Sequence, residues 1–261
     1  MPAAERDYEG SSAMPYVWND DIRIHYQVEG AGPAVVLQHG FTDSLASWYD
    51  FGYVDPLKRD YMLILIDARG HGQSDKPHHN SAYAMERRVA DIVSVLDEVG
   101  MSRAHYFGYS MGGRIGFGMA KHVSDRLGSL VIGGASATPR KREAYPLLAP
   151  EMVSKGAAAI PELWDAPLPP ALRERVLKND LEALRASPID DLGYEDILPA
   201  IDVPCLFLVG DADPAYPMAK ANAAKIPGAR FVAIPGENHA GTFLRSDLMV
   251  SHVMQFLREV S

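Results

Sequence analysis

The chain has 261 residues, 47% of them hydrophobic, which is enough for one large α/β domain with a substantial core. Its formal net charge is −9, from 25 basic and 34 acidic residues. This charge argues against a nucleic-acid partner, because proteins that bind nucleic acids carry clusters of lysine and arginine. No apolar run approaches membrane-spanning length and the first ten residues lack the apolar core of a signal peptide, so we expect a cytoplasmic protein without a membrane span.

The first part of the chain alternates short apolar runs with helical patterns. Four runs predict strands: 15–18, 22–28, 34–38 and 61–66. The first two flank the turn Asn19-Asp-Asp21 and predict a hairpin, whereas the other two are continuous apolar runs typical of strands buried on both faces. A polar lead-in up to Met14 precedes them. Helices are predicted at 44–57 and 85–99, the second ending at Gly100.

The central feature of the sequence is Gly108-Tyr-Ser110-Met-Gly112-Gly113, which follows an apolar run and precedes residues at helical spacing. This pattern predicts a strand, a tight turn and a helix. Glycines beside Ser110 allow two backbone segments to approach closely, while the serine takes a strained conformation that exposes its hydroxyl at the carboxyl end of the strand. The first free N–H groups of the helix would lie there too, where they could stabilise a developing oxyanion.

The alternation stops after a strand predicted at 127–132. Residues 137–199 hold nine prolines and no strand pattern. A helix opening at Pro169-Pro170 carries five leucine or valine side chains at helical spacing, which are Leu172, Val176, Leu177, Leu181 and Leu184. A connection of roughly 60 residues is longer than an ordinary loop. We therefore expect a helical cap at 137–199, inserted into a core formed by 1–136 and 200–261.

Strand–helix alternation resumes after the proline-rich segment. A strand at 204–209 leads to Gly210-Asp-Ala-Asp213, and a strand at 230–234 leads to Gly236-Glu-Asn-His239. The first of these strands contains Cys205, the single cysteine, which we expect to be a buried thiol rather than a nucleophile. An amphipathic helix follows from Ser246. Such alternation predicts a mostly parallel sheet covered by helices on both faces.

Three polar residues follow strands of this predicted sheet, in the order Ser110, Asp213 and His239. Because the carboxyl ends of parallel strands meet at one edge, residues far apart in sequence can converge there. A serine hydroxyl becomes a good nucleophile when an imidazole takes its proton, and a carboxylate fixes the tautomer of that imidazole. The order serine, acid, histidine is typical of one hydrolase arrangement.

The chain resembles the α/β-hydrolase superfamily from about residue 35 to the C-terminus, except for the cap. Five segments carry the resemblance: Gln38-His-Gly-Phe41, Asp67-Ala-Arg-Gly-His-Gly-Gln-Ser-Asp75, Gly108-Tyr-Ser-Met-Gly-Gly113, Gly210-Asp-Ala-Asp213 and Gly236-Glu-Asn-His239. The resemblance implies an α/β-hydrolase fold with Ser110 as nucleophile and His239 as general base and acid. It also implies an oxyanion hole made by the backbone N–H groups of Phe41 and Met111, and no cofactor or metal.

Two residues compete for the role of the acid, Asp211 and Asp213. The spacing usual in the superfamily, counted from the strand-ending glycine, matches Asp213, which leaves Asp211 as a turn or capping residue. Some members carry the acid one strand earlier. That position here, 133–137, contains no carboxylate.

Several other polar residues near these motifs have structural interpretations. We expect His39 to position the oxyanion loop, His71 to tie down its own loop and Asp67 to form a turn. The pair His78-His79 lacks partners at ligand spacing and predicts a solvated loop rather than a metal site. Two tryptophans, Trp48 and Trp164, are candidates for the lining of a pocket, the second from the cap.

The sequence favours a cofactor-independent serine hydrolase that acts on a small carboxylic ester, thioester or lactone. Haloalkane dehalogenases and epoxide hydrolases of the superfamily need an aspartate nucleophile, and position 110 is serine. Hydrolases of C–C bonds also use serine but usually carry asparagine before it, where this chain has Tyr109. They are the alternative enzyme. A third hypothesis is a non-catalytic small-molecule binder that retains the same residues.

Overall fold

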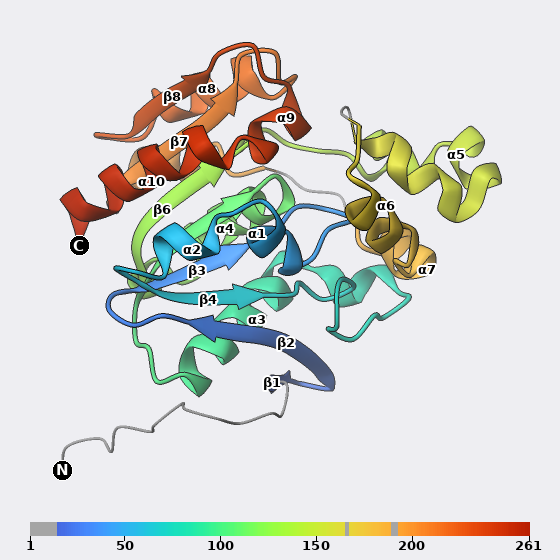
Figure 1. Cartoon of the computed structure of the whole chain (residues 1–261), viewed down its shortest axis with the longest axis horizontal. Coiled ribbons are helices and arrows are strands. Elements are labelled where there is room, and N and C mark those ends of the chain that lie inside the picture. The colour runs from blue at the N-terminus through green and yellow to red at the C-terminus, as the bar shows by residue number, and fades with distance from the viewer. Residues whose placement is uncertain (1–14, 165–166, 189–192) are drawn as a thin grey trace.

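The computed structural model describes residues 15–164, 167–188 and 193–261. The lead-in expected up to Met14 lies outside these residues. The fold is organised on an eight-stranded sheet (Figure 1). Its strands are β1 (Tyr16–Asn19), β2 (Ile22–Glu29), β3 (Ala34–Gln38), β4 (Met62–Ile66), β5 (Ala104–Tyr109), β6 (Leu127–Gly133), β7 (Cys205–Gly210) and β8 (Arg230–Ile234).

The strands lie in the order β1-β2-β4-β3-β5-β6-β7-β8. The hairpin β1–β2 is antiparallel and β2 also pairs antiparallel with β4, whereas all other pairs are parallel. This confirms the predicted mostly parallel sheet. It also brings the carboxyl ends of β3, β5, β6, β7 and β8 to one edge.

Helices cover both faces of the sheet, as predicted. One face is covered by α3 (Met85–Glu98), α4 (Met111–His122) and α8 (Tyr216–Ala223), and the other by α1 (Ala46–Asp50), α2 (Val54–Leu57) and α10 (Ser246–Val260) (Figure 1). Because successive side chains of a strand point to opposite faces, the central strands supply both cores. Val36 belongs to the core under α3 and α4, and its neighbour Val35 to the core under α10.

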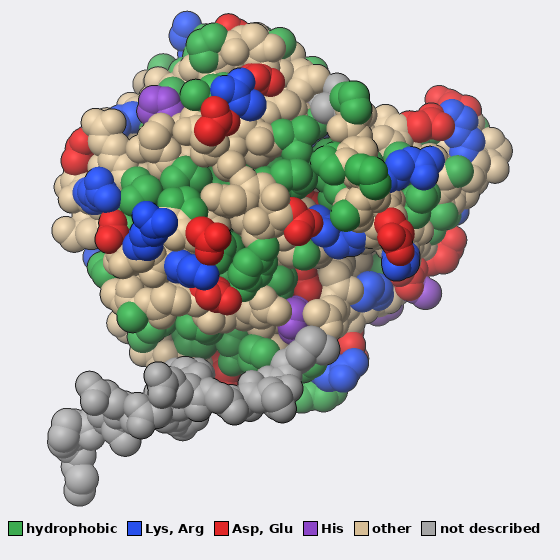
Figure 2. Space-filling view, viewed as in Figure 1, with side chains coloured by type: hydrophobic (Ala, Val, Ile, Leu, Met, Phe, Trp, Pro, Cys, Tyr) green, Lys and Arg blue, Asp and Glu red, His purple; other side chains and the backbone are tan. Residues whose placement is uncertain are grey.

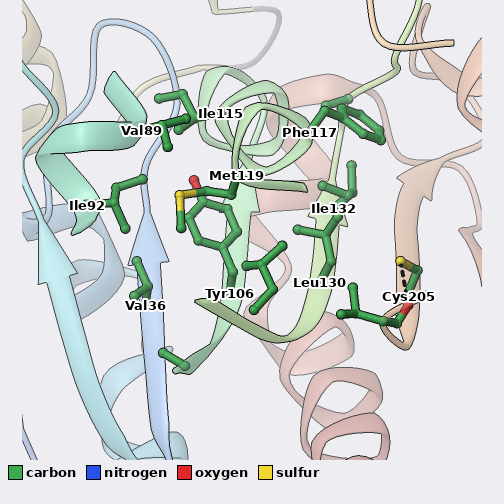
Figure 3. Close-up of a cluster of buried hydrophobic side chains, with 14 of the residues drawn as sticks. Val36, Val89, Ile92, Tyr106, Ile115, Phe117, Met119, Leu130, Ile132 and Cys205 are labelled. Atoms are coloured by element: carbon green, nitrogen blue, oxygen red, sulfur yellow. Dashed lines mark hydrogen bonds between the residues drawn. The ribbon is translucent and has the colours of Figure 1, made fainter. Parts of the chain in front are cut away.

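Figure 3 shows the first of these cores, where Val36 and Ile92 lie on one side of Tyr106 and Leu130 on the other. Cys205 lies at the edge of this cluster, with its Sγ 3.3 Å from the carbonyl oxygen of Val203. Burial raises the pKa of the Cys205 thiol to about 12. The thiol therefore stays protonated at neutral pH, which confirms the expected buried thiol.

Two predicted helices are each divided in the structure. The stretch 44–57 forms α1 and α2, separated at Gly52, whose positive φ of 79° no helix can include. The helix predicted from Pro169-Pro170 ends as α6 (Pro170–Leu177) and restarts as α7 (Leu181–Ala186). Asp180 causes the restart, because its side chain accepts a hydrogen bond from the N–H of Ala183 and caps the second helix.

The segment 137–199 contains α5 (Pro150–Lys155), α6, α7 and short 3₁₀ turns, and none of its described residues lies in a strand. It has a small apolar cluster of its own, formed by Leu147, Ala159, Ile160, Leu172, Val176 and Leu184. This cluster packs on Phe41 and Phe51 of the main body, beyond the carboxyl ends of β3 and β4 (Figure 1). The segment therefore lies over the edge at which the candidate site was expected.

The surface is mixed in charge. Figure 2 shows acidic and basic side chains interspersed over one face of the molecule. Among the described residues, no helix combines the length and the apolar character that crossing a bilayer requires.

Candidate active site

Ser110 lies in the turn between β5 and α4, with φ +52° and ψ −109°. Positive φ is strained for a residue with a side chain and persists only where the surroundings hold it. Two backbone hydrogen bonds do so: Ser110 N–H donates to the carbonyl of Gly133 at 2.8 Å, and its own carbonyl accepts from Arg114 N–H at 3.1 Å. The turn has the strained geometry that the sequence predicted.

The glycines of this turn are required by close backbone contacts. A Cβ atom on Gly108 would collide with the carbonyl of Gly112, and one on Gly112 would collide with the carbonyl of Gln38 at the end of β3. The Tyr106 hydroxyl donates to the carbonyl of Gly112 at 2.8 Å and fixes the first turn of α4. The first turn of α4 therefore packs directly against the ends of β3 and β5.

Ser110, His239 and Asp213 form one hydrogen-bonded chain. The Ser110 Oγ lies 2.9 Å from His239 Nε2, and His239 Nδ1 lies 2.7 Å from Asp213 Oδ2. With the imidazole proton on Nδ1, that nitrogen donates to the carboxylate and leaves Nε2 to accept from the serine hydroxyl. Asp213 is 4% exposed and its second oxygen accepts from Ala215 N–H at 2.7 Å.

The histidine stands at the start of a short helix, α9 (His239–Leu244), that sequence reasoning missed. Asn238 caps this helix, with its side-chain oxygen accepting from Gly241 N–H at 2.7 Å. The Tyr109 hydroxyl donates to the carbonyl of His239 at 2.6 Å. An asparagine directly before the histidine was the sequence signal for this helix start.

The two candidate acids have different surroundings. Asp211 is exposed, and its carboxylate accepts from Gly236 N–H at 2.8 Å, so it closes the turn between β7 and the loop after β8. Asp213 is the carboxylate that reaches the imidazole. The geometry thus separates a turn-forming from an imidazole-bonded aspartate.

The proposed oxyanion donors lie on either side of the serine. Met111 is the first residue of α4, where N–H groups have no partner inside the helix. Phe41 follows Gly40, and a Cβ atom on Gly40 would lie 3.4 Å from the Cβ of Ser110, so this loop passes directly beside the serine. Within the described part of the chain, neither the N–H of Phe41 nor that of Met111 donates a hydrogen bond.

His39 supports this loop from below and is fully buried. Its Nδ1–H donates to the carbonyl of Gly40 at 2.7 Å, and its Nε2 accepts from Ala68 N–H at 3.1 Å. Both ring nitrogens are used by backbone groups. The expected positioning role of His39 therefore matches its contacts.

His71 lies beside the same loop, with its ring 5.7 Å from that of Phe41. Its Nδ1–H donates to the carbonyl of Arg69 at 3.1 Å, while Nε2 is buried and finds no partner among the described residues. Burial holds the pKa of His71 well below its usual value. The folded protein therefore carries this imidazole in its neutral form, next to Phe41.

This burial predicts a pH-dependent stability. Below about pH 6.5 the unfolded chain binds a proton on His71, whereas the folded chain does not. The free energy of unfolding therefore decreases as the pH falls from that value, by at most about 1.4 kcal/mol per pH unit. Urea unfolding at pH 7 and pH 5 measures this. His71→Asn should lose less stability between the two pH values than the wild type, and the exposed control His79→Asn should lose as much. An equal loss in His71→Asn and wild type would contradict the assignment.

Asp67 has the loop-forming contacts expected of it, whereas the exposed His78 has a carboxylate partner that the sequence did not predict. Asp67 accepts from the N–H groups of Leu45 at 2.8 Å and Gln73 at 2.9 Å, so it joins its own loop to the residues before α1. His78 is exposed and bonds Asp180 of the 137–199 segment at 2.9 Å. The described residues hold no group of three side chains arranged to bind a metal ion.

A cavity of about 180 Å³ opens directly at Ser110 and His239. Its walls are mainly apolar and aromatic, and those from outside the turn around Ser110 include Phe41, Tyr145, Leu163, Trp164 and Phe243. Trp164 comes from the 137–199 segment, and its indole N–H donates to the Thr42 hydroxyl at 3.1 Å. Trp48 is fully buried against Tyr53 and Phe107 in the core and does not line this cavity.

Comparison with known proteins agrees with this architecture. A family model described as alpha/beta hydrolase fold matches residues 33–188. A Bacillus subtilis protein named "Putative 2-succinyl-6-hydroxy-2,4-cyclohexadiene-1-carboxylate synthase" is 27% identical, and the match covers 91% of this chain and 96% of that protein.

Two solved structures are similar over nearly the whole chain. A hydrolase from Pseudomonas aeruginosa PA01 has a TM-score of 0.84 at 25% identity, covering 95% of this chain and 99% of that one. The esterase RhEst1 from Rhodococcus sp. ECU1013 has a TM-score of 0.82 at 26% identity, covering 94% and 98%.

Proposed function

The chain belongs to the α/β-hydrolase family, and we propose that it is a serine hydrolase that cleaves a carboxylic ester, thioester or lactone of a small molecule through an acyl-enzyme on Ser110. The observation that carries the proposal is the 2.9 Å contact between Ser110 Oγ and His239 Nε2 in a strained turn, with Asp213 behind the imidazole. The likeness to an esterase at 26% identity supports the substrate class.

In the proposed reaction, Ser110 Oγ attacks the carbonyl carbon while its proton passes to His239 Nε2. The negative charge on the carbonyl oxygen is stabilised by the N–H groups of Phe41 and Met111. When the bond to the leaving alcohol breaks, His239 gives that alcohol the proton. Water then attacks the acyl-enzyme, its proton moves through His239 to Ser110 Oγ, and the carboxylic acid leaves. Asp213 stabilises the imidazolium in both halves.

Steady-state hydrolysis of 4-nitrophenyl esters of increasing acyl length tests the proposal, with a dienone C–C substrate included. We expect many turnovers on the esters and little or none on the dienone. Cleavage of the dienone with no ester turnover would favour the C–C hydrolase. A single acylation per molecule, without further turnover, would indicate the non-catalytic binder.

We further propose that residues 137–199 act as a cap that selects substrates without supplying chemistry. Ser110 lines the 180 Å³ cavity, and the segment contributes five further residues to its wall: Arg140, Tyr145, Pro146, Leu163 and Trp164. It is tied to the oxyanion loop, because Asn179 donates to the carbonyl of Thr42 at 2.7 Å and Trp164 to its hydroxyl at 3.1 Å. An apolar wall at this position would exclude water and favour an apolar acyl group.

Trp164→Ala should therefore enlarge the acyl pocket. We expect the ratio of kcat/KM for a long over a short acyl ester to rise by about tenfold, the size of effect that one or two methylenes produce in an apolar pocket. The control is Trp18→Ala, because Trp18 is 61% exposed on β1 and remote from the site. An unchanged ratio in a folded Trp164→Ala variant would place the selecting surface elsewhere.

A further inference from the structure

The nucleophile lies where three hollows meet, and one arginine lines all of them. Besides the 180 Å³ cavity, Ser110 borders a hollow of about 60 Å³ and an open one of about 680 Å³. Arg140, in the chain after β6, contributes to the walls of each. A substrate seated on Ser110 would therefore meet this guanidinium whichever hollow its groups enter.

The Arg140 guanidinium has no hydrogen-bond or ion-pair partner among the described residues. It is exposed and lies over the ring of Tyr145 at 5.3 Å. Stacking on an aromatic ring holds an arginine in place while leaving its N–H edge available. Because that edge is a planar fork, it is suited to a carboxylate.

A second arginine, Arg88, also lines the smallest of the three hollows. Arg88 of α3 is 6% exposed, and its guanidinium donates to neutral acceptors, the carbonyl of Tyr83 at 2.9 Å and the carbonyl of Ser187 at 2.7 Å. Its Nη1 points to the sulfur of Met111 at 3.3 Å, and a thioether is a weak acceptor. No described carboxylate forms an ion pair with it, although a buried charge is normally paired.

The small hollow contains no opposing charge among its described walls. Arg88, Arg140 and Arg114 line it together with Ser110 and Met111, and no described aspartate or glutamate does. The guanidinium of Arg114 already donates to the carbonyls of Ser136 and Thr138. The chain as a whole has a net charge of −9, so the local charge beside Ser110 is opposite in sign to that of the protein.

We propose that Arg88 and Arg140 form a carboxylate subsite, so that the substrate is an ester, thioester or lactone bearing a carboxylate close to its scissile carbonyl. The inference rests on the proposed function and adds the chemical class of its substrate. The planar guanidinium fork can bind both oxygens of a carboxylate, and the hollow of about 60 Å³ has room for such a group. The positive wall would also attract anionic substrates from solution.

Matched pairs of esters test the subsite and locate the charge. One pair, 4-acetoxybenzoate and its methyl ester, carries the carboxylate on the leaving group. The other, monophenyl glutarate and phenyl methyl glutarate, carries it on the acyl group. We expect kcat/KM, divided by each ester's alkaline hydrolysis rate, to favour the anion in at least one pair by about 10- to 100-fold, as for a hydrogen bond to a charged group.

Variants separate the subsite from the general charge of the protein. Arg140→Gln should lower the anion-to-neutral ratio by about tenfold, and Arg140→Lys should retain part of it, because lysine keeps the charge and loses the fork. The control Arg59→Gln removes the same charge at an exposed position and should leave the ratio unchanged. Arg88→Gln is the second test, read after thermal unfolding has confirmed a folded variant.

Turnover of the neutral esters without preference for either anion would overturn the subsite and leave the proposed function standing. A preference that survives both Arg140→Gln and a folded Arg88→Gln would also overturn it. If no ester were turned over and Ser110 could not be acylated, the proposed function would fail and the subsite with it.

Discussion

Ser110→Ala is expected to lower kcat for ester hydrolysis by about 10⁶-fold, because the loss of a triad nucleophile removes the covalent route and leaves only binding and oxyanion stabilisation. KM should change little, since the hydroxyl contributes to bond formation more than to substrate binding. The measurement is kcat on a 4-nitrophenyl ester, with the variant prepared free of wild-type enzyme.

The loss of activity can be assigned to the missing hydroxyl only if the Ser110→Ala variant is folded. Circular dichroism and thermal unfolding should match the wild type, because alanine keeps the Cβ atom and the same strained φ of +52°. Ser251→Ala serves as the matched control, since Ser251 is exposed on α10 and its hydroxyl donates to the carbonyl of Leu248 within the same helix. Turnover by Ser110→Ala within tenfold of wild type would exclude Ser110 as the nucleophile.

The second large effect is expected at the acid. Asp213→Asn should lower kcat by about 10⁴-fold, because an asparagine amide in place of the carboxylate favours the wrong imidazole tautomer and withdraws the charge that stabilises the imidazolium. The Asp213 carboxylate lies 2.7 Å from His239 Nδ1 and is buried, so a water molecule cannot easily take its place beside the imidazole in the variant.

Asp211→Asn is the matched control, two residues away and of the same chemistry. It should lower kcat by less than tenfold, because the asparagine oxygen can still accept from Gly236 N–H and preserve the turn. A reversed order of the two effects would mean that Asp211 reaches the imidazole during catalysis and Asp213 closes the turn.

Much of this architecture could be predicted from local patterns. Continuous apolar runs identify the buried strands because a strand covered on both faces has no solvent side. The turn around Ser110 could be predicted because glycines at 108 and 112 permit a backbone approach that no larger residue allows. The resemblance to the α/β-hydrolases, through its usual spacing from the strand-ending Gly210, also implied Asp213 as the aspartate that the structure brings to His239.

Short helices and long-range contacts were beyond local patterns. The helix α8 and the six-residue α9 are too short to produce a strong period, and α9 depends on the Asn238 cap. The leucine and valine spacing predicted one continuous helix, and it gave no sign that Asp180 would end the first helix and cap a second one. Arg88 and Arg140 line the same hollow although they are far apart in sequence, so no local pattern could pair them.

The central claim is that Ser110 becomes acylated, and the most direct measurement is covalent labelling by a fluorophosphonate followed by peptide mapping. We expect an adduct of one phosphonyl group per chain, on the peptide that contains Ser110. Labelling should be lost in Ser110→Ala and greatly slowed when His239 is replaced by alanine. An adduct on any other residue, or equal labelling of Ser110→Ala, would show that Ser110 is not the acylated residue.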